Sequence, residues 1–176
     1  MELNSKMSEF DEPDLQILQQ LEAEEELNLS ELSDEIGLSK SAIHYRLNKL
    51  KENGVVTGMS AQLDPLAFGL EMMMITDVMV THETGYAEDI GEQLTEIGGV
   101  NQVYYTMGDV DFVVISRVQN REQMNDLVDE MIAIDGVNET SSKFVMDEFK
   151  TDSRVLTNMS EEMVENVAQT DGASSE

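Results

Sequence analysis

The sequence predicts an α+β protein of two parts, a three-helix unit followed by a unit of order β-α-β-β-α-β. Three observations support this. Residues 28–54 carry start and stop signals for two short helices joined by a tight turn. From residue 70 onward the apolar residues alternate between strand and helix spacing. The pattern IGGVN at 97–101 recurs as IDGVN at 134–138, each time between a helix and a strand.

Helix-capping residues define the first unit, which we expect over residues 11–63. Asp11 caps a first helix that has a proline in its first turn. Asn28 caps the second helix, and Ser39 caps the third. Gly54 follows the third helix at the position where a left-handed residue ends a helix. A strand pair, or wing, is expected over residues 55–63.

The third helix holds the one concentration of positive charge in the chain. No Asp or Glu occurs from residue 36 to residue 51, although Asp and Glu number 37 in the whole chain. Ile43, Leu47 and Leu50 form one apolar stripe, and the opposite face is polar. The basic residues of this stretch, four of ten in the chain, are Lys40, Arg46, Lys49 and Lys51.

That polar face suits a recognition helix in the DNA major groove. Short polar side chains and an imidazole can read base edges, while Lys and Arg contact phosphates. The alternative is an ordinary solvated helix face, but the helix signals on both sides and the missing acids favour DNA. The expected DNA-binding residues are Ser39, Lys40, Ser41, His44, Tyr45, Arg46, Asn48 and Lys49.

The second unit is expected to be a ferredoxin-like sandwich. Strands are predicted at 70–80, 100–107, 111–118 and 137–149, and helices at 84–97 and 121–134. Two βαβ units of this kind form one antiparallel sheet with both helices on one face. The other face then needs a cover, and a second copy of the same sheet is the economical one. Met72, Met74 and Val114 are candidates for that face.

Composition indicates a folded chain with an acidic coat. The formal net charge is -27, yet 40% of residues are hydrophobic. Because charges repel less at about 1 M salt, where the Debye length is roughly 3 Å, we expect a halophilic cytoplasm. The chain has no cysteine, which excludes disulfides and thiolate chemistry. No apolar stretch is long enough to span a membrane, so we expect a cytoplasmic protein.

Catalysis and metal binding are not expected. The two histidines, His44 and His82, fall in different units, and no nucleophile–base pair is evident. The acidic run 24–26 is typical of a solvated loop, because consecutive carboxylates on one turn diverge. We therefore expect no enzyme, no cofactor and no metal site.

Four stretches resemble the Lrp/AsnC, or feast/famine, transcriptional regulators. They are FDEPDLQIL at 10–18, ELSDEIGLSKSAIHYRLNKLKENGVVTG at 31–58, LDPLAFG at 63–69, and TMGDVDFVV at 106–114. The resemblance covers about residues 10–154. It implies a winged helix-turn-helix followed by a ferredoxin-like, RAM-type ligand-sensing domain. It also implies binding to double-stranded DNA, assembly as a homodimer or a ring of dimers, and an amino-acid effector bound between dimers.

The resemblance also suggests effector residues. Gly108 and Asp111 match the family's loop before the third strand, near which effector sites lie, and Asp109 lies between them. Thr140, Ser141 and Ser142 could add hydroxyls for an amino-acid ammonium or carboxylate. The expected effector-binding residues are Gly108, Asp109, Asp111, Thr140 and Ser142.

Alternatives remain open at this point. Gly108 and Asp109 could instead form a two-residue hairpin turn. The wing has Met59 where the family often has an aromatic residue, and few other basic residues support the third helix. A sensing or interaction module without significant DNA binding is therefore the second functional hypothesis. The expected boundaries are a flexible N-terminus at 1–10, the winged unit at 11–63, a linker at 64–69, the sensing domain at 70–154 and an acidic tail at 155–176.

Overall fold

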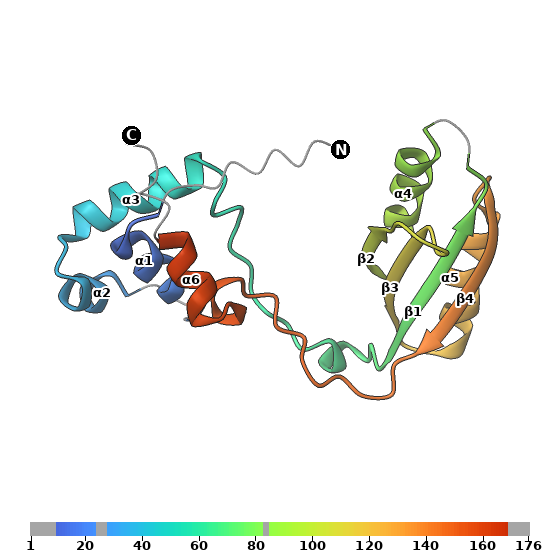
Figure 1. Ribbon diagram of the computed structural model, residues 1–176. Helices are drawn as coiled ribbons and strands as arrows, with labels where there is room; N and C mark the ends of the chain where they lie inside the picture. The colour runs from blue at the N-terminus through green and yellow to red at the C-terminus, as the bar shows by residue number, and fades with distance from the viewer. Residues whose placement is uncertain (1–9, 24–27, 83–84, 169–176) are drawn as a thin grey trace. The chain divides into compact units, whose positions relative to one another are not determined.

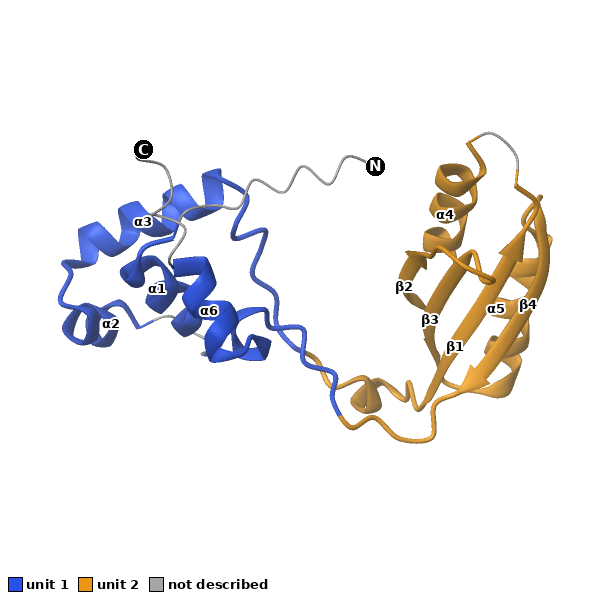
Figure 2. Cartoon of the chain, in the orientation of Figure 1, with its two compact units in different colours: residues 1–62, 150–176 blue, residues 63–149 orange. Residues whose placement is uncertain are grey.

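The chain forms two compact units in the computed structural model, which describes residues 10–23, 28–82 and 85–168. One unit groups Met1–Gln62 with Lys150–Glu176, and the other is Leu63–Phe149 (Figure 2). The expected boundaries put the end of the sensing domain at residue 154 and an acidic tail at 155–176. Instead the chain from Lys150 on groups with the N-terminal residues.

Three helices build the first part of unit 1, and their starts are capped as predicted. The Asn28 side chain accepts hydrogen bonds from backbone N–H groups two and three residues on, at 3.1 and 3.4 Å. Ser39 Oγ accepts one from the N–H three residues on, at 3.2 Å. The Asp11 carboxylate does the same at 2.9 Å. The helices are α1 (Glu12–Ala23), α2 (Leu29–Ile36) and α3 (Lys40–Glu52).

The core of unit 1 confirms the predicted apolar stripe of α3. Ile43 is fully buried, and Leu47 and Leu50 are nearly so. They pack with Ile17 of α1 and Leu32 of α2 in one hydrophobic cluster. Because these three helices share a single small core, the outer face of α3 is fixed by what its inner face buries.

The predicted wing is wrong for the described structure of this chain. Residues 55–63 take part in no strand pairing among the described residues. Val55 and Val56 turn back onto the core, since both N–H groups bond to the carbonyl of Leu50. The rest runs on as an extended segment. An isolated pair of strands is only marginally stable unless it packs on a sheet or a helix. This stretch would have no such support for a strand pair.

The C-terminal segment adds to unit 1. It contains the short helix η2 (Leu156–Asn158) and the helix α6 (Glu161–Ala168). Figure 1 shows α6 beside α1, and η2 contacts α1 as well.

Unit 2 confirms the predicted order of elements. Its strands form one antiparallel sheet of order β2-β3-β1-β4, as a ferredoxin-like sandwich requires. A 3-10 helix, η1 (Pro65–Phe68), precedes the sheet in the expected linker. The elements are β1 (Met72–Val80), α4 (Tyr86–Glu96), β2 (Val100–Tyr105), β3 (Phe112–Val118), α5 (Arg121–Ala133) and β4 (Val137–Phe144).

The assignment of sheet faces was wrong by one residue. Met74 and Val114 are fully buried in the core beneath α4 and α5, and Met72 packs against that core. Since successive strand residues point to opposite faces, the uncovered face carries their neighbours. The run of three methionines in β1 has no polar alternation, so the sequence did not reveal which residues face inward. The half-buried residues of the uncovered face are Met73, Ile75, Asp77, Met79, Val113, Ile115 and Arg117.

The internal repeat forms two copies of one turn. Gly99 and Gly136 have φ angles of 92° and 93°. In each copy the N–H after the glycine donates to the isoleucine carbonyl three residues earlier, at 3.1 Å. This is a type II turn, which needs a positive φ at its third residue. A Cβ at residue 99 would lie 3.0 Å from the Arg117 carbonyl oxygen, so glycine is also required for space.

Candidate DNA-reading surface and effector groove

The outer face of α3 presents the predicted polar side chains to solvent. Ser41, His44, Asn48 and Lys49 are exposed, and Tyr45 is 71% exposed. This face lies opposite the buried stripe, as expected from the helical spacing. It offers hydroxyl, imidazole, phenol and amide groups together with an ammonium, which are the groups that bind base edges and phosphates.

Two of the predicted residues also hold the turn between α2 and α3. Ser39 Oγ caps α3 and lies 3.2 Å from Ser41 Oγ. Lys40 Nζ donates to Ser30 Oγ at the start of α2. Both side chains are exposed, so they remain candidates for phosphate contact beside this structural role.

Arg46 lies differently from the other basic residues of α3. Its Nη1 is 2.7 Å from a carboxylate oxygen of Asp11 and 2.7 Å from one of Asp14. Only 29% of the Arg46 side chain is exposed. The hydrogen bond to Asp14 is the largest effect on its pKa, which is raised. These partners were not predicted from the sequence, although two carboxylates three residues apart at a helix start are a readable signal.

The same contact acts on Asp11. Partial burial works to raise the pKa of Asp11, but hydrogen bonds from the Asp14 N–H and from Arg46 hold that pKa below its ordinary value. A carboxyl with a lowered folded-state pKa stabilises the fold above its unfolded pKa of about 4, and this stabilisation is lost as pH falls further. The bridge therefore ties α3 to α1 at neutral pH and weakens in acid.

We expect Arg46→Met to lower the free energy of unfolding of unit 1 by about 1 kcal/mol at pH 7, because two carboxylates lose their shared partner. The difference from the unmodified chain should shrink below about pH 4, where those carboxylates protonate. Lys51→Met is the matched control, since Lys51 is exposed and forms no ion pair with another described residue. Denaturant titrations from pH 3 to 7 measure the free energy of unfolding of both variants. Equal losses in the two variants would contradict the bridge.

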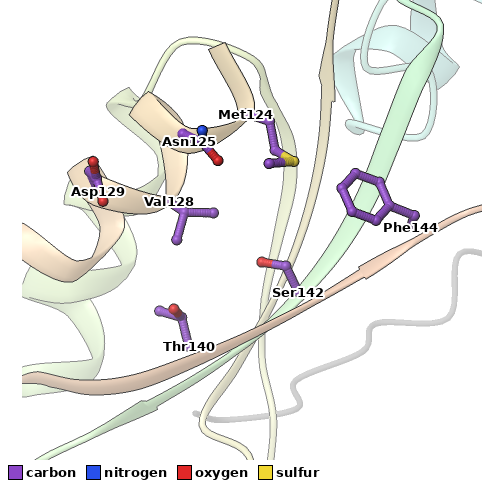
Figure 3. Close-up of a pocket in the computed structure, with 7 residues that line it drawn as sticks. All are labelled: Met124, Asn125, Val128, Asp129, Thr140, Ser142 and Phe144. Carbon is purple, nitrogen blue, oxygen red and sulfur yellow. The ribbon is translucent and has the colours of Figure 1, made fainter. Parts of the chain in front are cut away.

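A groove between α5 and β4 collects two of the predicted effector residues. It has a volume of about 470 Å³. Figure 3 shows Met124 and Val128 extending from α5 toward Thr140 and Ser142 on β4. Thr76 Oγ1 lies 2.9 Å from Ser142 Oγ and holds that hydroxyl. Asn125 and Asp129 on α5 and Phe144 on β4 complete the lining. The α5 residues were not predicted from the sequence, because the polarity of a helix alone gives no reason to pair it with β4.

The other predicted effector residues do not line this groove. Gly108 and Asp109 lie in the connection between β2 and β3, and both are exposed. The alternative of a two-residue hairpin turn at Gly108 and Asp109 is wrong, because β2 ends at Tyr105 and β3 begins at Phe112. The Thr106 N–H donates to the Asp111 carbonyl at 2.8 Å and closes a longer loop.

Asp111 is buried and links the start of β3 to the end of β1. Its Oδ2 accepts a hydrogen bond from the Val80 N–H at 2.9 Å, and its Oδ1 lies 2.6 Å from His82 Nε2. The His82 ring stacks on Tyr86 with centroids 5.0 Å apart. These contacts account for an aspartate at this position without a ligand.

A pair of tyrosines continues this cluster. The Tyr86 and Tyr105 hydroxyls are 2.7 Å apart. The hydrogen bond with Tyr105 is the main effect that raises the pKa of Tyr86 to about 12. The Tyr86 phenol therefore remains neutral at ordinary pH. This cluster was not predicted from the sequence.

Comparison with known proteins agrees with this arrangement. Residues 10–57 match the model of a winged helix-turn-helix DNA-binding domain. Residues 75–155 match the Lrp/AsnC ligand binding domain. The HTH-type transcriptional regulator FL11 of Pyrococcus horikoshii is 34% identical over 137 residues, which make up 78% of this chain and 89% of that protein. The chain belongs to the Lrp/AsnC family.

Other Lrp/AsnC relatives extend the match. The FL11 regulator of Pyrococcus abyssi is 32% identical over the same share of both chains. The transcriptional regulator NMB0573 of Neisseria meningitidis, solved as an L-Met complex, superimposes with a TM-score of 0.78 at 25% identity and covers 85% of this chain and 97% of its own. The feast or famine regulatory protein of M. tuberculosis, complexed with L-methionine, has a TM-score of 0.74 at 27% identity and covers 82% and 97%.

These matches establish the chain as a DNA-binding transcriptional regulator with a ligand-binding domain. Among the described residues no group of three or more acids and histidines could hold a metal ion. None of the described helices is both long and apolar enough to cross a membrane. Residues 24–26, which we expected to form a solvated loop, lie outside the described residues.

Proposed function

We propose that α3 reads a DNA operator and that an amino acid in the α5–β4 groove changes the affinity for that operator. The exposed face of α3, opposite Ile43, Leu47 and Leu50, is the observation that carries the DNA part. The groove residues carry the effector part. A regulator of this kind works where the DNA is, so we place it in the cytoplasm.

The chemistry of the groove fits an amino acid. The Thr140 and Ser142 hydroxyls and the Asn125 amide can donate to a carboxylate, and Asp129 can accept from an ammonium. Met124, Val128 and Phe144 offer an apolar wall for a side chain. Two relatives were solved with L-methionine, so methionine is the first probe to test.

We expect the double variant Thr140→Val and Ser142→Ala to bind the amino acid at least about tenfold more weakly, since two hydroxyl contacts worth roughly 1 kcal/mol each are removed. Operator affinity without amino acid should not change. Ser141→Ala is the matched control, because Ser141 pairs with Asp77 on the opposite sheet face. Calorimetry with L-methionine and then with the other amino acids measures binding. An unchanged affinity in the double variant would exclude this groove.

Gly108, Asp109 and Asp111 remain secondary candidates. In Asp109→Ala the exposed carboxylate is removed without disturbing a described hydrogen bond. If Asp109 binds the effector's ammonium, this variant weakens amino-acid binding in the same calorimetry while operator affinity stays the same. Asp111 is less suited, since both of its oxygens already have partners.

We propose that the uncovered sheet face pairs with the same face of a second copy. Ile75, Ile115, Val113 and Met79 supply an apolar centre. The Arg117–Glu148 ion pair lies at one end of it, and the Asp77–Lys143 ion pair lies within it, because Asp77 is between Ile75 and Met79 on β1. A patch used twice by the same chain gives a two-fold dimer, and dimers of this kind can join into rings.

We expect Ile115→Asp to convert the dimer into a monomer, because a carboxylate would be buried without a partner. Ile132→Asp is the matched control, since Ile132 is 52% exposed on α5. Light scattering gives the mass of each. A dimeric Ile115→Asp chain would place the interface elsewhere.

The chain is not proposed to be an enzyme. Its relatives are transcriptional regulators, and His44 and His82 lie in separate units. A sensing module without DNA binding is the alternative, favoured by one observation, the engagement of Arg46 with Asp11 and Asp14. A mobility-shift assay on the chain's own promoter in molar KCl decides between the two.

A further inference from the structure

One carboxylate of α1 accepts several hydrogen bonds from the C-terminal segment. Glu22 Oε1 accepts a hydrogen bond from the Val155 N–H at 2.6 Å. Glu22 Oε2 accepts from the N–H groups of Leu156 and Thr157 at 2.9 and 3.2 Å, and Thr157 Oγ1 lies 3.5 Å away. Hydrogen bonds to an ionised acceptor are stronger than neutral ones, and here one side chain receives three from the backbone.

The bound segment also has internal order. The Arg154 guanidinium pairs with both Asp152 oxygens. This contact lowers the pKa of Asp152 to about 2, so the pair stays charged at any ordinary pH. The Asn158 side chain bonds to the carbonyls of Asp152 and Arg154. We call residues 152–168 the C-terminal clasp.

The clasp packs on α1 beyond the Glu22 contact. Leu156, Met159 and Val164 line a hollow against Gln19 of α1. Most of the clasp lies beyond residue 155, where the match to the Lrp/AsnC ligand binding domain ends.

The clasp connects the chain that leaves the groove to α1, the helix whose carboxylates bind Arg46. Phe144, which lines the effector groove, ends β4, and the clasp begins eight residues later. At the other side, α1 holds Glu22 near its end and Asp11 and Asp14 at its start, and these two carboxylates bind Arg46 on α3. The chain leaving the groove is thus fixed to the helix that braces the DNA-reading helix.

We propose that the C-terminal clasp transmits effector binding from the groove to α3, with Glu22 as the positioning residue that keeps the clasp on α1. This inference rests on the proposed function, since it needs both an effector in the groove and an operator on α3. Without the clasp, unit 1 would be joined to the sheet by the chain at Gln62 and Leu63 alone. An effector could then bind without changing operator affinity.

The clasp itself can be tested without DNA or effector. In Glu22→Gln an amide NH₂ replaces one acceptor and faces backbone N–H groups. Hydrogen exchange at residues 155–157 and 161–168 should be slow in the unmodified chain and about tenfold or more faster in Glu22→Gln. Glu12→Gln makes the same change on an exposed residue of the same helix. Hydrogen exchange of the clasp should stay slow in this variant. Exchange at the rate of unfolded chain in the unmodified protein would overturn the proposal.

Transmission is tested by the ratio of operator affinities with and without a saturating amino acid. The probe is each of the twenty amino acids until one binds. We expect the unmodified chain and Glu22→Gln to bind that amino acid equally. The ratio should be kept in Glu12→Gln, and should approach one in Glu22→Gln and in a chain lacking residues 155–176.

The outcomes separate the two levels of inference. If Glu22→Gln frees the clasp yet keeps the full ratio, the transmission proposal is wrong and the proposed function stands. If the unmodified chain binds no amino acid or no operator, the proposed function fails, and transmission fails with it whatever the exchange data show.

Discussion

In 0.1 M KCl we expect the purified chain to be largely unfolded, and in 2 M KCl to be folded. The formal net charge is -27, and Asp111 is the one buried acid among the described residues. The other described acids therefore repel one another across the surface. The Debye length is about 10 Å at 0.1 M and roughly 3 Å at 1 M, so added salt removes most of that repulsion. Circular dichroism during heating, across a KCl series, measures the change.

Two controls show whether screening is the cause. Sucrose at matched osmolality favours compact states without screening charge, so it should restore less structure than KCl does. The double variant Glu88→Gln and Glu92→Gln removes two acids four residues apart on α4 and should lower the KCl concentration needed for folding. Equal melting temperatures at 0.1 and 2 M KCl would show that the acidic coat has no such role.

Lys49→Glu should reduce operator affinity by about ten- to a hundredfold, because a phosphate contact worth roughly 1–3 kcal/mol becomes a repulsion. Lys49 is exposed on α3 and forms no ion pair with another described residue, unlike Arg46. Log affinity should also fall less steeply with log salt concentration. The slope should decrease in magnitude by about one for each phosphate that the variant no longer neutralises. Mobility shifts in 0.5 to 2 M KCl give both quantities.

Arg121→Glu is the matched control for Lys49→Glu. It changes the net charge by the same amount at an exposed residue of unit 2, the first residue of α5. If the two variants bind the operator equally weakly, the effect is one of total charge, and α3 is not the reading helix. A decrease confined to Lys49→Glu locates the phosphate contact on α3.

Local signals in the sequence were enough for the helices and for the order of the strands. Asn28 and Ser39 cap the helices that they were predicted to cap, and the repeated glycines occupy matching turns. The exposed face of α3 followed from three buried residues at helical spacing. These features depend on neighbours within a few residues, which is why a single sequence reveals them.

Features that depend on distant partners were missed. Arg46 was expected to bind DNA, but its side chain pairs with two carboxylates that lie 32 and 35 residues earlier. The groove joins α5 to β4 across the edge of a sheet. The inward face of β1 could not be read from three consecutive methionines, because nothing in their polarity distinguishes one side from the other. The family resemblance suggested Thr140 and Ser142, which the structure places together in the groove, but not the residues opposite them.

The division of unit 1 between the two ends of the chain has a consequence for how the protein is made. Residues up to Gln62 are synthesised before the sheet, and Lys150–Glu176 after it. The amides that Glu22 binds thus become available only once the whole sheet has been made. A shorter product that ended after the sheet would carry α3 but not the segment secured to α1, so Glu22 would lack its backbone partners.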